Sequence, residues 1–297
     1  MANTIALAEK FQPILDEIYK VGALTARMDS PSKPVDFSNA QVVKVFKTSL
    51  IGLGDYDRGT GFPAGDVTGS WETLTLAKDR GRSFSIDAMD DEETIGMAFG
   101  TLVGEFMRTM VVPEIDAYRF DKYASWSGIT SPSAAALSTA ANVLAAVDVA
   151  QQALDGDEVP REGRVLYCSE SIYHLLKASL TRSYVSEGAV SRELNRLDNM
   201  EVVMVPQTRF YKGVTLDAGA TSSAGGYSKT PSTGRDINFM LIHPSAVLQV
   251  AKHNPLRIFS PEQNQTADAW LFQYRIYHDA FVYDNKVDGV YAHIKTS

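Results

Sequence analysis

The stretch from residue 91 to residue 112 constrains the fold most, because its helical pattern contains its own helix breakers. Gly96, Gly100 and Gly104 recur at four-residue intervals and share one face of the predicted helix. Apolar residues keep the helical period over the same stretch, at Ile95, Phe99, Leu102, Phe106 and Met110. Each interior glycine costs about 1 kcal/mol relative to alanine, so a close approach of another backbone is expected. That backbone belongs either to a second membrane helix or to a neighbouring element of a soluble protein.

Charged residues argue against the membrane alternative. Glu105 and Arg108 interrupt the apolar run, and acids at 90–93 and at Glu114 bound it. A membrane span needs roughly 20 residues with few or no charges. The first 20 residues also lack the basic start and continuous apolar core of a secretory signal. With 44% hydrophobic and 22% charged residues, the chain of 297 residues is expected to be soluble and globular, without a membrane partner.

Charge and cysteine content limit the partners further. The 28 Lys and Arg against 36 Asp and Glu leave a net charge of -8, which argues against a surface that grips phosphates. Cys168 is the single cysteine, so no intrachain disulfide can form. It lies in an apolar run and is expected to be a buried strand residue.

The first part of the chain predicts extended elements. Residues 4–26 have helical spacing and lead into a proline-punctuated connector, which together predict an arm. Strand-like residues begin at 41, a glycine-rich tip follows at 52–69, and strand-like residues resume at 71–87. This order predicts a long two-stranded hairpin. The helix that follows, with Asp90 and Glu93 as a capping box, is a rod of roughly 30 Å. Pro113 is expected to kink or restart it for two or three more turns.

The second part alternates helices and strands around a sizeable core. Helices are predicted over 137–154 and 171–180, and strands over 163–169, 200–206 and 237–243. The polar glycine and serine tract 217–235 is predicted to be a surface loop. Two aromatic strands joined by a turn at 284–289 close the chain.

No catalytic, cofactor or metal motif is complete. Lys229 is preceded by Ser228 where a phosphate-binding loop has glycine, and Asp57 takes the third glycine position of a dinucleotide fingerprint. The five histidines are scattered, Ser169 lacks the glycines of a nucleophile elbow, and the acids at 90–93 suit helix capping. We therefore expect no enzyme, no cofactor and no metal. An arm, a hairpin and a rod that leave the core are typical of chains whose projections are buried on neighbouring subunits.

Four segments resemble the major capsid proteins of tailed bacteriophages, whose subunits share the fold named for phage Hong Kong 97. The segments are DYDR at 55–58, WETLTLAKDRGRSFSID at 71–87, VVPEIDAYRF at 111–120 and VYDNKVDGVY at 282–291. The resemblance follows the whole chain in order. It implies an α+β, Hong Kong 97-like fold with an N-terminal arm, an extended β-hairpin loop, a peripheral domain with a long spine helix, and an axial α/β domain.

The resemblance also implies a division of the chain. The arm spans 1–40, the extended loop and its flanking strands 41–90, the spine helix and peripheral domain 91–133, the axial domain 134–262, and the closing strands 263–297. The implied function is self-assembly through pentamers and hexamers into an icosahedral virion shell around double-stranded DNA, put together in the bacterial host cytoplasm. Because the arm begins at once, no cleaved scaffolding segment is expected. A separate scaffolding protein, a portal protein and decoration proteins are the expected partners.

Two alternatives stay open at this stage. The first is an encapsulin-type nanocompartment, which shares the fold and encloses protein cargo. The second, less favoured, is a soluble α/β enzyme whose site is formed by residues distant in sequence. The tip also contains neither a lysine nor an asparagine, so the covalent crosslink of some relatives is not expected there.

Eight residues are predicted to lie at subunit interfaces. The tip is expected to be mobile in a free subunit and to become ordered across an adjacent one, with apolar contacts from Tyr56, Phe62 and Trp71. Charged residues in the recognised segments are expected to pair within or between subunits. They are Arg58, Arg80, Arg82, Glu114 and Asp116.

Overall fold

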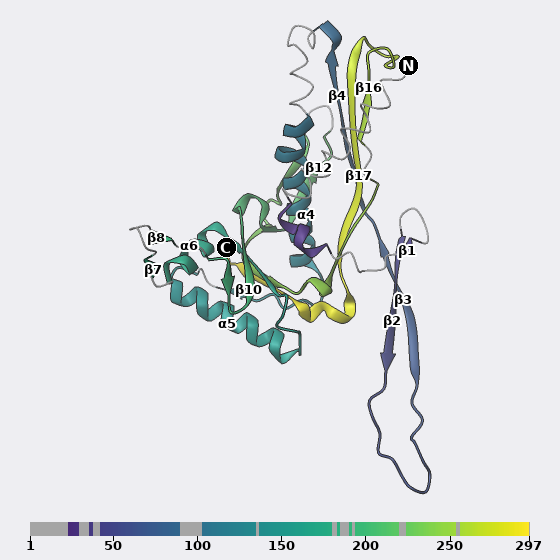
Figure 1. Ribbon diagram of the computed structural model, residues 1–297, viewed down its shortest axis with the longest axis vertical. Coiled ribbons are helices and arrows are strands. Elements are labelled where there is room, and N and C mark those ends of the chain that lie inside the picture. Colours follow the sequence, from purple (N-terminus) through teal and green to yellow (C-terminus); the bar gives the residue numbers. More distant parts are fainter. Residues whose placement is uncertain are drawn as a thin grey trace.

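The computed structural model describes residues 23–29, 36–37, 42–89, 103–134, 137–179, 183–184, 190–191, 194–219, 224–253 and 256–296. Within these residues the chain forms a projecting hairpin, a four-stranded sheet and a seven-stranded sheet (Figure 1). The hairpin extends to one end of the molecule and the four-stranded sheet to the other, while the seven-stranded sheet lies to one side.

The hairpin is a regular antiparallel ribbon. Strands β2 (Val42–Leu50) and β3 (Val67–Thr75) pair along their whole length. The short strand β1 (Asp36–Phe37) pairs with the start of β2. Alternating β-branched and aromatic residues favour this extended structure, and the glycine-rich residues 51–66, called the tip from here on, connect the two strands.

The returning strand of the predicted excursion is split between two sheets. Strand β4 (Lys78–Asp87) does not continue the hairpin but pairs with the long strand β17 (Ala269–Val282). The opposite side of β17 pairs with β15 (Val247–His253) and β16 (Leu256–Phe259). In this sheet Phe84 of β4 packs with Phe272 and Tyr274 of β17 on the face that a helix covers.

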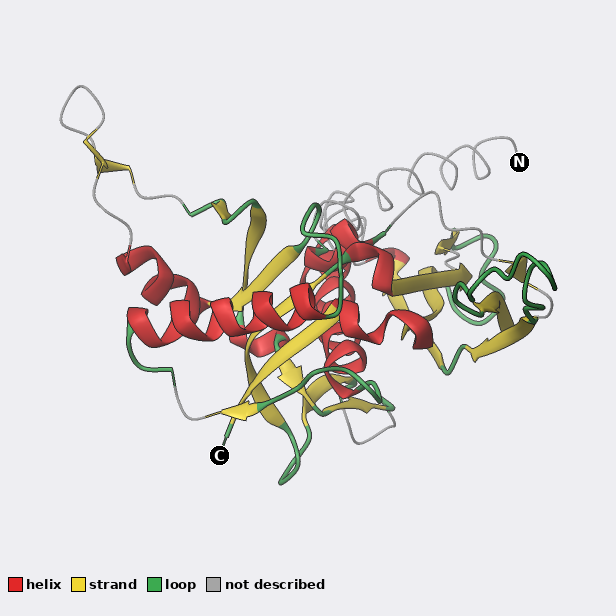
Figure 2. Cartoon of the chain, turned by 90° about the horizontal axis from the view of Figure 1, so that it is seen from below, coloured by secondary structure: helices red, strands yellow, loops and turns green. Residues whose placement is uncertain are grey.

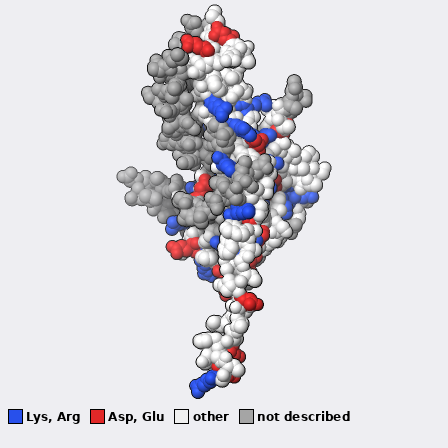
Figure 3. Space-filling view, turned by 90° about the vertical axis from the view of Figure 1, so that its right-hand side faces the viewer, with Lys and Arg blue, Asp and Glu red and all other residues white. Residues whose placement is uncertain are grey.

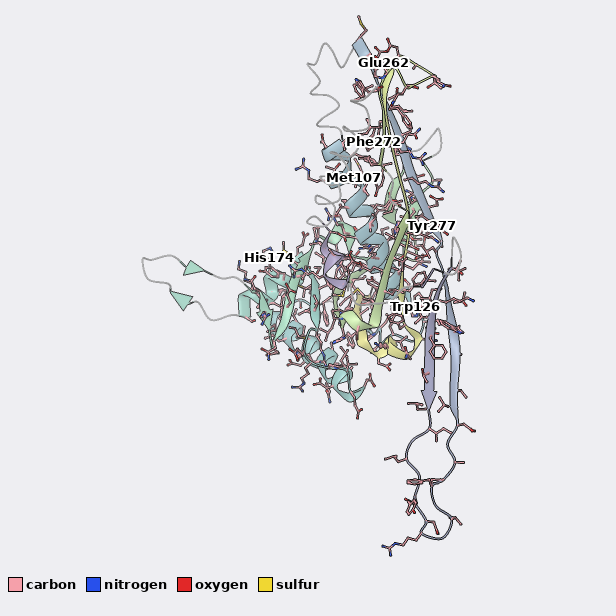
Figure 4. The ribbon with its side chains drawn as sticks, turned by 45° about the vertical axis from the view of Figure 1, so that its right-hand side comes forward. Met107, Trp126, His174, Glu262, Phe272 and Tyr277 are labelled. Atoms are coloured by element: carbon pink, nitrogen blue, oxygen red, sulfur yellow. The ribbon has the colours of Figure 1, made fainter. Side chains whose placement is uncertain are left out.

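A helix that we call the spine helix covers this sheet. It contains helical residues 103–106, a π-helical turn at Met107–Val111 and α4 (Val112–Ser125). Met107 packs against sheet residues such as Phe272 (Figure 4). The predicted continuation past Pro113 is confirmed, with a physical reason for the wide turn. Proline has no N–H and its ring crowds the carbonyl four residues earlier, and here the N–H of Val112 bonds the carbonyl of Met107, five residues back.

The seven-stranded sheet is buried on both faces. Its central strands are β6 (Val165–Ser169), β10 (Met200–Val205), β14 (Arg235–Ile242) and β18 (Val290–Lys295), with β5 (Ser133–Ala134), β9 (Arg196–Leu197) and β11 (Tyr211–Lys212) at its margins. Helices α5 (Ala140–Gly156) and α6 (Glu170–Ser179) cover one face (Figure 2), and α4 packs on the other. Tyr167 therefore contacts the α4 side while Cys168 contacts the α5 side, which explains the unbroken apolar run of β6.

The glycine and serine tract is more ordered than predicted. Strands β12 (Val214–Asp217) and β13 (Gly226–Lys229) pair in a hairpin that lies against α4, so the predicted surface loop is wrong for part of the tract. The reason is tertiary, because β4 supplies side chains that bind this hairpin from outside, as described below.

The remaining described elements are short. They are η1 (Leu24–Met28), β7 (Ser183–Tyr184), β8 (Val190–Ser191), η3 (Gln207–Arg209), η4 (Pro244–Ala246) and η5 (Asp284–Gly289). Most of the predicted arm, the capping box, Gly96 and Gly100 lie outside the described residues. Gly104 is described, and a Cβ built there meets no atom within 4 Å, so no element of the described chain approaches it closely. The domain boundaries stay a prediction.

Candidate assembly surfaces

One face of the hairpin is apolar and uncovered. Two cross-strand pairs, Phe46 with Trp71 and Leu50 with Val67, lie on this face, which we call the apolar face. Their exposed fractions are 54, 59, 71 and 69% respectively. Beyond the base, the opposite face carries polar partners such as Lys47 with Ser70, and at the base it carries the buried pair Val43 and Leu74. The ribbon is therefore one-sided, although in the described structure water reaches both of its faces.

The apolar face is held in shape by its own aromatic rings. Phe46 meets Trp71 edge to face, with ring centroids 5.0 Å apart. Gly69, opposite Thr48 between the two cross-strand pairs, lies under the Phe46 ring, because a Cβ at this position would stand 2.6 Å from Phe46 Cζ. An aromatic ring that covers a strand glycine restores packing that the glycine lacks.

The tip presents a second aromatic pair. The rings of Tyr56 and Phe62 lie 4.8 Å apart, and Phe62 is 88% exposed. The Asp57 carboxylate accepts hydrogen bonds from the N–H groups of Gly59 and Thr60, and these bonds hold the pKa of Asp57 below its ordinary value. Figure 3 shows a hairpin with few charges along its length and charged atoms of both signs at its far end. Arg58 is the single basic residue of the tip.

The base of the hairpin is anchored in the body. Val43 and Leu74 are buried with Leu76 against Leu248 and Phe281. On the polar face, Lys47 Nζ lies 3.1 Å from Glu72 Oε2 and also pairs with Asp284 of η5. The hairpin is therefore anchored in the body at its base, and beyond the base it projects into solvent.

Acidic side chains of α4 hold three separate elements. Glu114 binds Arg80 of β4 through two bonds, from Nε at 2.7 Å and from Nη2 at 3.1 Å. Asp116 accepts from the N–H of Leu24 at 3.0 Å and from the N–H and hydroxyl of Thr25. Asp121 accepts from the backbone at the start of β12, at 2.6 Å from Gly213 N. The helix thereby joins β4, the N-terminal segment and the β12–β13 hairpin.

Asp116 lies in the interior of the subunit. Its carboxyl group is fully buried, and burial raises its pKa above the ordinary value although Thr25, Leu24 and Arg119 act in the opposite direction. Arg209 Nη1 stands 3.5 Å away as a further positive group. The contacts of this predicted interface residue are therefore with its own chain, and a role between subunits stays a prediction.

Two arginines of β4 bind the mouth of the β12–β13 hairpin. Arg80 donates to the carbonyls of Asp217 and Gly226, the last residue pair of the ladder, at 2.6 and 3.3 Å. Arg82 donates to the carbonyls of Gly219 and Ala224, both at 3.4 Å. Arg80 is half-buried whereas Arg82 is exposed, so the Arg82 guanidinium keeps donors that point to solvent.

The structure thus divides the eight predicted residues into two groups. It brings Arg80, Arg82 and Glu114 together beside the spine helix, with Asp116 buried nearby on the same helix. Tyr56, Arg58, Phe62 and Trp71 lie on the hairpin, away from that group (Figure 1). Sequence reasoning missed Phe46, Leu50 and Val67, although two-residue alternation from Trp71 could have found them once the strand register was assumed.

Three further observations concern metal ligands, membrane spans and the single cysteine. No group of three or more His, Cys, Asp or Glu side chains there could hold a metal ion. The helices of the described part are too short or too polar to cross a membrane. Cys168 is buried, and burial raises the pKa of its thiol to about 12, so it is not a reactive nucleophile.

Solved structures with a similar fold are virus shells and related particles. No protein-family model matches the sequence, and a search of curated proteins finds no match. The capsid of cyanophage P-SCSP1u aligns with a TM-score of 0.59 and 12% identity over 88% of this chain and 85% of that chain. The mature capsid of bacteriophage PhiM1 aligns with a TM-score of 0.55 and 15% identity over 91 and 90%.

A particle from a different kind of source aligns over still more of the chain. The virus-like particle from Pyrococcus furiosus gives a TM-score of 0.55 and 13% identity over 96% of this chain and 98% of that chain. Such low identities speak to the fold alone, and the mutual coverage shows that the likeness extends over most of the length of this chain. This chain has the α+β, Hong Kong 97-like capsid fold that its sequence predicted.

Proposed function

We propose that this chain is a major capsid protein, which assembles through pentamers and hexamers into the icosahedral shell of a tailed bacteriophage. The observation that carries the proposal is the one-sided hairpin on a body with a capsid fold. An isolated two-stranded ribbon is marginally stable in water, and monomeric proteins rarely expose large contiguous apolar patches. Burial of the apolar face on a second copy would stabilise the ribbon and would remove the exposed apolar patch.

A contact between a hairpin and a different surface of the next copy is heterologous. Repeated heterologous contacts close into rings when the rotation between copies permits it. Rings of five and six copies of one chain are the units from which an icosahedral shell closes. Small changes at hinges within the subunit allow one sequence to occupy both rings.

The shell is proposed to enclose double-stranded DNA without binding its sequence. A chain with net charge -8 offers few cations for phosphate contacts, so the packed DNA is not held to the wall. A separate scaffolding protein, a portal protein and decoration proteins complete the proposal, with assembly in the bacterial host cytoplasm. The chain itself is proposed to be structural and not an enzyme.

Electron microscopy of the expressed chain, alone and with its candidate scaffolding protein, tests the proposal. Curved sheets, tubes or closed shells are expected, and hairpin deletion at residues 51–66 is expected to abolish them. A small monodisperse particle at every concentration, with and without the scaffolding protein, would contradict the proposal.

A protein nanocompartment is the second candidate, because a virus-like particle aligns over nearly the whole chain. The two candidates differ in content. Particles purified from the native source would contain DNA and one portal vertex if they are phage heads, and cargo protein without a portal if they are nanocompartments. Nuclease-protected DNA in the particles decides for the phage head.

A further inference from the structure

A groove of about 430 Å³ lies between the spine helix, the four-stranded sheet and the β12–β13 hairpin. Its floor is apolar and is formed by the helix and by the face of the sheet that the helix covers. The floor residues are Phe84, Phe106, Val111, Tyr274 and Ile276. Small-molecule sites in proteins are concave and mostly apolar, have volumes of about 300 to 1000 Å³, and carry a few placed polar groups. The groove has the volume and the floor of such a site.

Most charged groups around the groove already have partners in the chain. Glu114 accepts two hydrogen bonds from Arg80, whose other bonds go to carbonyls of the β12–β13 hairpin. Asp217 Oδ1 accepts from the backbone N–H two residues later at 3.0 Å, within its own turn. Glu105, on the helix side, is exposed, so water and salt screen its charge. Arg82 is therefore the cation of the groove that a bound molecule can use.

The backbone around Arg82 holds its guanidinium at the edge of the groove. Nη1 and Nη2 donate to the carbonyls of Gly219 and Ala224, both at 3.4 Å. Gly219 has a φ of +68°, and a Cβ there would stand 2.7 Å from Nη1. Gly225 has a φ of +76°, and a Cβ there would stand 3.7 Å from the same atom. Two glycines in the left-handed region thus leave the room that the guanidinium occupies.

The oriented guanidinium keeps donors for a ligand. Its two bonds use two of the five N–H groups, and no carboxylate in the described part of the chain pairs with it. Arg82 is the cross-strand partner of Tyr274, so the cation lies directly beside the apolar floor. Long bonds at an exposed site contribute little to stability, so stability does not account for this orientation. A cation beside an apolar floor is instead the combination that recognises an amphiphilic anion.

We propose that the groove binds a small monocarboxylate with an unbranched aliphatic chain, a medium-chain fatty acid in solution. The carboxylate accepts two parallel hydrogen bonds from Arg82, and the aliphatic chain lies on the floor. Met110, which is 60% exposed at the helix side of the groove, is covered by the bound chain. This binding site goes beyond the proposed function, and every measurement below uses free full-length subunits, so the result does not depend on shell formation.

Isothermal titration calorimetry with dodecanoate, kept below its micelle concentration, tests the proposal. One molecule is expected to bind per subunit. Each buried methylene changes Kd about fourfold, so decanoate should bind about 15-fold more weakly than dodecanoate. Dodecyltrimethylammonium has the same chain and the opposite charge, and it should bind more than about tenfold more weakly. Equal affinity for the anion and the cation would show apolar adsorption alone and would overturn the inference.

Two substitutions locate the site. Arg82→Ala should weaken dodecanoate binding more than about tenfold while leaving the unfolding of the subunit nearly unchanged. The matched control is Arg257→Ala, which removes an exposed arginine from β16 of the same sheet, outside the groove. Thr109→Trp fills the groove from an exposed position on the helix and should also weaken binding. Equal affinities of the Arg82 and Arg257 variants, or full affinity of the tryptophan variant, would overturn the inference.

The apolar face of the hairpin is the competing place for an aliphatic chain. Phe46→Ala with Trp71→Ala removes its rings and should leave dodecanoate binding unchanged. Loss of binding in this double variant would move the site to the hairpin and overturn the inference.

Oxidation of Met110 tests the same contact without any substitution. Hydrogen peroxide converts exposed methionine to its sulfoxide. At ten times the Kd of dodecanoate about nine tenths of the subunits carry the ligand, so oxidation of Met110 should slow about tenfold. Met89, which is 66% exposed and lies outside the groove, should react at the same rate with and without dodecanoate. Equal slowing of both methionines, or of neither, would overturn the inference.

Discussion

The hairpin and helix α4 are both long, regular elements, but helix α4 is mostly buried in the subunit and the hairpin is mostly exposed. Ten of the 14 residues of α4 are buried, and its acids bind three other elements. Among the described residues of β2 and β3, Val43 and Leu74 alone are buried, both at the base. The rings beyond the base contact one another and water.

The difference separates two sources of order. Helix α4 is held by its own chain, so the body is expected to fold in a single subunit. Beyond its base, the hairpin exposes apolar surface that we expect another copy of the chain to cover. Substitutions in the two regions should therefore affect different measurements, and the four below run from the largest to the smallest expected effect on subunit stability.

Phe120→Ala sharpens the comparison from the side of the body. Phe120 is fully buried, with ring centroids 5.1 Å from Tyr167 and 5.0 Å from Phe210. Removal of such a ring leaves a cavity, so unfolding free energy should fall by about 3 to 5 kcal/mol. Urea unfolding of free subunits, followed by circular dichroism, measures the loss. If Phe120→Ala lowered the unfolding free energy by less than Phe46→Ala does, the division between a self-supported body and an exposed hairpin would be contradicted.

Acid is expected to weaken the body through His278. Burial, with the charges of Arg119, Arg80 and Lys78, lowers the pKa of this histidine from 6.5 to about 3. The unfolded chain then binds a proton more tightly, so stability present above pH 6.5 is lost as the pH falls toward 3, by up to about 4 kcal/mol.

The variant His278→Phe isolates this effect. It removes the titrating group and keeps a ring beside Tyr118, whose centroid lies 5.5 Å from the imidazole. Asp116 acts in the opposite direction. Because its pKa is raised in the folded state, its contribution to the stability of the subunit increases as the pH falls. The measurement is therefore the difference in unfolding free energy between variant and unmodified subunits from pH 7 to pH 4. A difference that is constant over this range would assign the acid sensitivity to other groups.

Local patterns predicted the body well. The unbroken apolar run of β6, the helical periods of α5 and α6, and the continuation of the helix past Pro113 are all present in the structure. Each depends on residues that are near one another in sequence, where periodicity reports which face is buried.

Contacts between distant residues could not be predicted in the same way. Residues 67–87 are strand-like throughout, and the pattern alone does not show that pairing passes from β2 to β17 at residues 76–77. Asp116 was expected to pair within or between subunits, but its partners Leu24 and Thr25 could not be named, because they lie over 90 residues earlier in the chain and leave no local signal. Tyr56 and Phe62 were predicted as interface residues because aromatic rings among glycines are conspicuous, while the same prediction for Phe46 needed the strand register.

Arg80→Ala sharpens the comparison at β4, the strand by which the chain passes from the hairpin into the body. Its guanidinium satisfies Glu114 and two carbonyls, so its loss leaves a half-buried carboxylate without its partner and should cost about 1.5 to 3 kcal/mol. Arg82→Ala is the matched control, because two long bonds at an exposed site should contribute less than about 0.5 kcal/mol. Equal losses in urea unfolding would show that burial around Glu114 has no energetic weight.

The hairpin itself should show the smallest effect on stability and a complete effect on assembly. The double variant Phe46→Ala with Trp71→Ala removes the larger cross-strand pair of the apolar face. Both rings are more than half exposed, so the free energy of unfolding of a free subunit should change by less than about 1 kcal/mol. In particles the same rings are expected to be buried, and their loss should prevent closed shells.

The opposite face of the ribbon supplies the control. Thr68→Ala with Ser70→Ala changes two exposed residues of β3 that lie between Val67 and Trp71 and point the other way. This variant should assemble like the unmodified chain, as judged by sedimentation velocity and electron microscopy at equal concentration. If both double variants assemble equally well, the sidedness of the hairpin is not used in assembly. If the aromatic variant instead unfolds several kcal/mol more easily, the hairpin belongs to the fold of the single subunit, and the contrast with α4 is one of degree.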